Sequence, residues 1–167
     1  TLIWSDYNTA VYNSRVWMTQ DRGKTIKCIL KNKVTQSESG EAINVRHFHC
    51  TFFDEKEQTL YITAGDYDYE NILIIGNYSK ESEKFTFKAL GPEDKYKIGM
   101  MFVKDELAFF VTDYADLEGL YSGLGYCYKD NIKEGDFGNH YLYKDKDDTA
   151  FLAYYADSNN NHILLGD

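Results

Sequence analysis

Two histidines separated by one residue mark the stretch of the chain with the most potential for chemistry. His47 and His49 flank Phe48, and alternate side chains of an extended strand point to the same face. Two imidazoles on one face can bind a divalent metal, because histidine is a common metal ligand. They can also be hydrogen-bonded structural residues. We adopt the second interpretation and predict no metal site.

Aspartates and tyrosines follow several apolar runs of β type. Asp66 and Asp113 each end such a run and are followed directly by Tyr67 and Tyr114, whereas Asp157 ends a further run without a tyrosine after it. Carboxylates beside aromatic rings suit sugar recognition, since rings stack on C–H faces while acids accept hydrogen bonds from hydroxyls. The aspartates can equally be turn caps that bind no ligand. We predict no catalytic residue and these ligand-binding candidates: His47, His49, Asp66, Tyr67, Asp113, Tyr114 and Asp157.

The segment 66–70 alternates acidic and aromatic residues. Its carboxylates are the oxygen ligands that Ca²⁺ prefers, but their spacing is not that of an EF-hand loop. We therefore predict no cofactor, and Ca²⁺ stays open as the alternative.

The composition restricts the possible partners. The chain has 167 residues and a net charge of -9, so it lacks the basic surface that phosphate backbones require. We exclude nucleic acid and anionic membrane surfaces, and no apolar run reaches the length of a spanning helix. The 3 cysteines are far apart without metal-ligand spacing, and we expect them reduced in a core. Because the chain begins at Thr1, we expect a fragment or a processed product.

The elements that position these residues are predicted to be strands. The chain has 15 Tyr, 10 Phe and only 1 Pro, and aromatic residues favour strands. β-type runs that end near Asp6, Asp66, Asp113 and Asp157 recur at intervals of about 40–60 residues, close to the length of a four-stranded propeller blade. The fold class is therefore predicted as all-β, built of four-stranded antiparallel meanders.

A heptapeptide near the N-terminus supports this repeat. Residues 19–25 read Thr-Gln-Asp-Arg-Gly-Lys-Thr. This sequence resembles the Asp-box, or BNR repeat, of sialidase-like β-propellers, although Ile26 stands where the family usually has Trp or Phe. In such a turn the Asp side chain accepts hydrogen bonds from backbone N–H groups and the Gly adopts a positive φ. The structural residues of this turn are Thr19, Asp21, Gly23 and Thr25.

The resemblance implies a propeller arc of about three and a half blades in one domain, residues 1–167. The expected blades span about 1–34, 45–90, 96–138 and 139–167, with strand 140–143 opening the last one, and both terminal blades are expected to be incomplete. The ligand candidates would then face the central axis of the propeller.

The resemblance also sets the expected function. Sialidases grip the substrate carboxylate with an arginine triad, whereas only Arg46 lies near the expected axis. We therefore favour a non-catalytic extracellular propeller of a secreted bacterial or phage tail protein. Its expected ligand is a glycan or a cell-surface receptor. Other chains, or the missing blades of the same propeller, are further expected partners. It would act outside the cell or on the virion surface. The alternatives are a fragment of a sialidase-like exo-glycosidase and a structural platform in a larger assembly.

Overall fold

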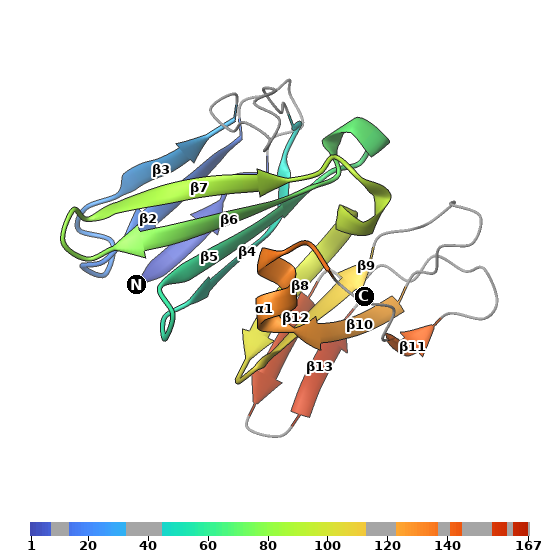
Figure 1. Cartoon of the computed structure of the whole chain (residues 1–167). Coiled ribbons are helices and arrows are strands. Elements are labelled where there is room, and N and C mark those ends of the chain that lie inside the picture. The colour runs from blue at the N-terminus through green and yellow to red at the C-terminus, as the bar shows by residue number, and fades with distance from the viewer. Residues whose placement is uncertain are drawn as a thin grey trace. The chain divides into compact units, whose positions relative to one another are not determined.

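The protein is seen in a computed structural model (Figure 1) that describes residues 1–7, 14–32, 45–112 and 123–136 and the backbone of 141–144, 155–159 and 162–166. Contacts along the chain divide it into two compact units, Thr1–Tyr96 and Lys97–Asp167. Each unit is considered by itself below.

The first unit opens with a three-stranded antiparallel sheet. Its strands are β1 (Leu2–Ser5), β2 (Arg15–Thr19) and β3 (Lys27–Lys31), in the order β1-β2-β3. The alternation of β2 places Val16 and Met18 in the interior, because successive side chains point to opposite faces. This sheet therefore has one face toward a core.

A four-stranded antiparallel meander completes the first unit (Figure 1). It consists of β4 (Phe48–Asp54), β5 (Thr59–Ala64), β6 (Ile72–Ser79) and β7 (Lys84–Leu90), paired in chain order. Every residue of β5 is buried, as expected for a central strand covered on both faces. The core joins both sheets of the unit, and its fully buried members include Val16, Leu60, Ile62, Ala64, Ile72 and Ile74.

The turn between β2 and β3 has the hydrogen bonds expected for residues 19–25. Asp21 Oδ1 accepts from the Thr25 backbone N–H at 2.9 Å, and Asp21 Oδ2 accepts from the Thr25 hydroxyl at 2.6 Å. The Thr19 hydroxyl donates to Asp21 Oδ1 and accepts from the Gly23 N–H, both at 2.9 Å. Gly23 has φ +87°. The side chains of Thr19, Asp21 and Thr25 thus hold the turn together.

The second unit contains another four-stranded antiparallel sheet. Its strands β8 (Ile98–Lys104), β9 (Leu107–Thr112), β10 (Gly123–Tyr128) and β11 (Tyr141–Lys144) follow one another in the sheet order β11-β10-β9-β8. A hairpin of β12 (Tyr155–Asn159) and β13 (His162–Gly166) follows.

Two details of this unit differ from the sequence expectations. The strand predicted to open a fourth blade at 140–143 is β11, and it pairs with β10 instead. The preceding helix α1 (Lys129–Lys133) buries Ile132 completely, and Gly135, two residues after its end, has φ +72°. Asp157 does not end a strand, because it lies inside β12 opposite Leu164.

The all-β class with four-stranded antiparallel meanders is confirmed. The described residues form no closed ring, which is compatible with a partial propeller, and the single arc of blades stays a prediction. No described helix has the length and apolar character needed to cross a membrane. All three cysteines are free, and Cys50 and Cys127 are buried.

Candidate functional site

The site is built at the start of β4 and in the loop that follows β5. Residues 45–47 lead into β4, and the loop after Ala64 contains Gly65, Asp66 and the short 3-10 helix η1 (Asp68–Glu70). The β4–β5 hairpin pairs Phe48 with Ala64. The start of one strand therefore lies beside the end of the other, which brings the two segments together.

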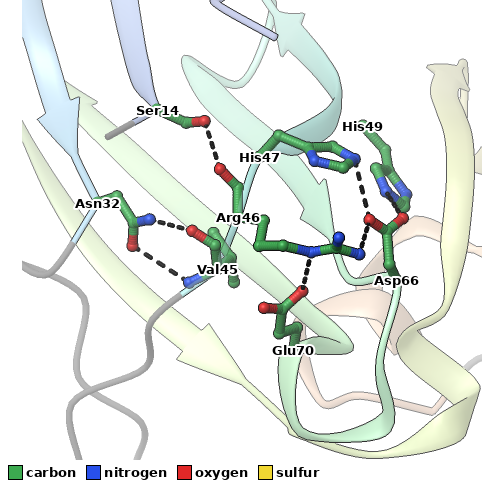
Figure 2. A network of polar contacts seen from close by, with 8 residues as sticks. All are labelled: Ser14, Asn32, Val45, Arg46, His47, His49, Asp66 and Glu70. Carbon is green, nitrogen blue, oxygen red and sulfur yellow. Dashed lines mark hydrogen bonds and ion pairs between the residues drawn. The ribbon is translucent and has the colours of Figure 1, made fainter. Parts of the chain in front are cut away.

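Both histidines face the Asp66 carboxylate (Figure 2). His49 Nε2 lies 3.2 Å from Asp66 Oδ1, and His47 Nε2 lies 3.5 Å from Asp66 Oδ2. The two imidazole centroids are 5.0 Å apart, while the intervening Phe48 is buried in the core. Both rings thus lie on one side of the chain, as expected from the sequence, although His47 precedes β4 and the register with β5 shifts between Phe48 and Cys50.

Arg46 connects this group to a second carboxylate. Its Nη2 contacts Asp66 Oδ2, and its Nε lies 3.6 Å from Glu70 Oε2. The guanidinium carbon also lies 4.3 Å from the ring centroid of Tyr67. Glu70 is only 1% exposed. Arg46 is therefore held between two acids and one aromatic ring.

The segment that carries Arg46 is fixed to the neighbouring sheet. Asn32 lies just after β3, and its Oδ1 accepts a hydrogen bond from the Val45 N–H at 3.2 Å. Its Nδ2 donates to the Val45 carbonyl, and the hydroxyl of Ser14 donates to the Arg46 carbonyl at 2.8 Å (Figure 2). These contacts set the position of Arg46 and His47 independently of any ligand.

The loop on the other side depends on a glycine. Gly65 has φ +127°, and a Cβ on it would lie 2.5 Å from Asn71 Cα. Only glycine fits this conformation and this close approach. Gly65 therefore lets the chain turn at the end of β5 and present Asp66 to the histidines.

The surroundings of the charged groups shift their ionisation. The hydrogen bond with His49 lowers the pKa of Asp66, and the positive charge of Arg46 acts in the same direction. Burial lowers the pKa of His47 and raises the pKa of Glu70. The site therefore favours an ionised Asp66 next to a neutral His47.

The site leaves some polar atoms unsatisfied. The Nδ1 atoms of His47 and His49 and the Glu70 Oε1 are buried and have no hydrogen-bond partner in the described part of the chain. Such atoms are uncommon in folded proteins, since an unpaired buried polar group costs stability.

Exposed tyrosines surround the buried polar group. Tyr67 and Tyr69 stack with centroids 5.6 Å apart and an interplanar angle of 14°. Tyr7 lies against His47 with centroids 4.2 Å apart. The exposed fractions of Tyr7, Tyr67 and Tyr69 are 69%, 49% and 59%. Aromatic surface is thus presented to solvent around a fixed carboxylate.

The structure brings together some of the residues expected from the sequence. His47, His49, Asp66 and Tyr67 form one group in the first unit. Asp157 belongs to the second unit, on β12. The remaining two candidates, Asp113 and Tyr114, lie outside the described residues.

Sequence reasoning missed two members of the site. Glu70 was considered only as part of an acidic run for Ca²⁺, although it pairs with Arg46 in the interior. Tyr7 was not among the predicted ligand residues, and its contact with His47 joins the segment after β1 to the segment before β4. One sequence signal could have indicated Glu70: it carries the charge opposite to that of Arg46, and these two residues flank the predicted ligands His47, His49 and Asp66 in the sequence.

Comparison of the chain with models of known protein families, with curated proteins and with solved structures gives no match.

Proposed function

We propose that this protein is a non-catalytic binding module that recognises carbohydrate through the exposed tyrosines around Asp66. The observation that carries the proposal is the parallel pair Tyr67 and Tyr69, exposed to solvent beside an Asp66 carboxylate fixed by Arg46 and His49. A sugar ring stacks on such aromatic faces while its hydroxyls donate to carboxylates.

The ordering of the site favours binding. Ligand affinity is limited by the entropy lost when side chains become ordered, so a site fixed in advance binds more tightly. Tyr67 already packs on the Arg46 guanidinium, and Arg46 is held by Asp66 and Glu70. These contacts reduce the number of groups that a ligand must order.

The disposition of the arginines supports binding over sialidase-like hydrolysis. Arg46 is engaged by two carboxylates. Arg15 packs over Trp17 on β2, and Arg22 lies in the turn between β2 and β3 with φ +61°. A carboxylate substrate needs free guanidinium groups that converge on it, and these three arginines are placed in other contacts or in a turn.

The resemblance of residues 19–25 to the Asp-box extends the proposal. This resemblance supports a partial sialidase-like propeller in a secreted bacterial or phage protein. Such a propeller would act outside the cell or on a virion surface and would bind a glycan or a glycosylated receptor. The turn itself holds β2 to β3 through Asp21, and its role in the proposal is structural.

A glycan array probed with the complete chain tests the proposal. We expect selective binding, weakened by Tyr67→Ala and by Tyr69→Ala by about 2- to 12-fold each, which corresponds to the energy of one aromatic stacking contact. Tyr128→Ala is the matched control, because Tyr128 lies in the second unit and is 66% exposed.

Three outcomes would contradict the proposal. The array shows no glycan above background, or both tyrosine variants bind as the parent does, or mass spectrometry detects cleavage of a bound glycan. The last result would restore the glycosidase alternative.

A further inference from the structure

We infer that His47, His49 and Asp66 form a three-ligand site for a divalent transition metal ion, and that zinc fits it. Among the residues that the structure describes, the metal-ligating atoms of these three lie within 4.8 Å of one another. The inference shares the Asp66 carboxylate with the carbohydrate proposal, but it is carried by the two largely buried histidines and not by the exposed tyrosines.

The ligand atoms lie close enough together to share one metal ion. Tetrahedral zinc has Zn–N and Zn–O bonds of about 2.0–2.2 Å, which places neighbouring ligand atoms about 3.3–3.5 Å apart. The distance of 3.2 Å between His49 Nε2 and Asp66 Oδ1 is close to this range, while the 3.5 Å distance of His47 Nε2 is to the other oxygen, Oδ2. In the absence of an ion the same 3.2 Å contact is a hydrogen bond, near the long end of the usual range of about 2.7–3.2 Å. Small adjustments of the three side chains would therefore place all three ligand atoms around one ion.

The types of ligand select the class of metal. Imidazole together with carboxylate suits zinc and the neighbouring divalent first-row metals, whereas calcium and magnesium prefer sites made only of oxygen. His47 and His49 both direct Nε2 toward Asp66 (Figure 2). The donor set is thus the two imidazole nitrogens and one carboxylate oxygen.

Arg46 takes the role of an outer partner. It contacts Asp66 Oδ2, while Oδ1 of the same carboxylate faces His49. Ligating carboxylates are commonly oriented by a second hydrogen bond of this kind. Arg46 is itself paired with Glu70, so its charge is shared between two acids. Asp66 can therefore use Oδ1 as a ligand while Arg46 holds Oδ2.

An ion can reach the site from solvent. The Asp66 side chain is 30% exposed, whereas His47 is 4% exposed. Three protein ligands leave a fourth tetrahedral position for water or for an oxygen of a ligand. A bound ion would connect the beginning of β4 to the loop after β5.

Zinc binding by the complete chain tests this inference. After treatment with a chelator, the protein is titrated with Zn²⁺ alone by isothermal calorimetry. We expect one ion per chain, and at least about tenfold weaker binding in His49→Gln and in Asp66→Asn. His162→Gln is the matched control, since it removes a histidine from strand β13 of the second unit.

Two further measurements distinguish a metal site from a folding effect. Co²⁺ bound to the parent protein should give the strong visible absorption of a four-coordinate ion. Zn²⁺ should raise the melting temperature of the parent but not that of Asp66→Asn, because a ligand stabilises only the state that binds it. Circular dichroism without metal shows whether each variant is folded.

The inference is overturned if the parent protein binds no stoichiometric Zn²⁺ at micromolar concentration. It is also overturned if folded His49→Gln and Asp66→Asn both bind Zn²⁺ as tightly as the parent. Should both variants fail to fold, the parent stoichiometry and the Co²⁺ spectrum decide: a six-coordinate spectrum or no bound ion refutes the site. Loss of zinc binding without loss of glycan binding would leave the carbohydrate proposal intact.

Discussion

Replacement of Gly65 by alanine tests whether the loop geometry at the end of β5 creates the site. Gly65 has φ +127°, and its Cβ would lie 2.5 Å from Asn71 Cα and 2.6 Å from Asn71 N. Both atoms are backbone, so the clash cannot be relieved by rotating a side chain. The loop must shift, and Asp66 is the next residue.

Two costs determine the size of the effect. A side chain in a disfavoured region of φ costs about 1–3 kcal/mol, and forcing extra volume into a packed region costs about 1–3 kcal/mol more. We therefore expect Gly65→Ala to lower the free energy of unfolding by about 4 kcal/mol.

Gly23→Ala provides the matched control. Gly23 also has a positive φ, +87°, but a Cβ there would meet nothing within 4 Å. Only the conformational cost applies, about 1–2 kcal/mol. The two variants therefore differ by about 2.5 kcal/mol, of which about 2 kcal/mol is the contact of residue 65 with Asn71.

Tryptophan fluorescence follows the unit that contains both glycines. The 2 tryptophans of the chain are Trp4 and Trp17, and they face each other across β1 and β2 in the first unit. For a unit of this size 1 kcal/mol shifts the melting temperature by about 4–8 °C. Gly65→Ala should thus melt about 10–20 °C below Gly23→Ala. Equal melting temperatures would refute the packing argument.

Two further predictions concern ionisation. Hydrogen bonds from the hydroxyl and the N–H of Thr25 lower the pKa of Asp21 from 3.8 to about 2. The ionised carboxylate therefore stabilises the turn above about pH 4. This contribution is lost as the pH falls through about 2. A carboxyl-carbon NMR titration should find this midpoint in the parent, and Thr25→Ala should raise it; a midpoint near 3.8 in the parent would contradict the turn geometry. Burial raises the pKa of Cys127 to about 11, so at pH 8 iodoacetamide should modify Cys127 in the folded protein far more slowly than the half-buried Cys28. Mass spectrometry of timed samples measures both rates, and equal rates would show that Cys127 is accessible.

Local patterns were sufficient to predict the core of the site. The alternation of a strand places His47 and His49 on one face, and the antiparallel hairpin brings the end of β5 to the start of β4. Both rules act over short stretches of chain. The proximity of Asp66 to the histidines follows from them.

The burial of Glu70 could not be predicted in this way. Its position depends on how the loop after Gly65 folds back against Asn71. The backbones of these two residues lie so close that a Cβ on Gly65 would be 2.5 Å from Asn71 Cα. An acidic residue in a polar run is ordinarily exposed. The partner that explains its burial, Arg46, is distant in sequence.

The assignment of β11 failed for a related reason. Helix α1 spans only Lys129–Lys133, too short for a helical pattern of apolar residues to be recognised. Without it, the strand that follows was assigned to a new sheet. In the structure β11 pairs with β10.

The outer strand of the first meander has a consequence for aggregation. Among the described residues β7 pairs only with β6, so its other edge carries backbone groups that another chain could use for strand addition. Its exposed positions are Lys84, Thr86 and Lys88, which alternate with half-buried Phe85 and Phe87. Charged lysines along an edge disfavour the approach of a second strand. The strand can therefore cover the core with its aromatic side chains while its lysines keep the protein from polymerising through this edge.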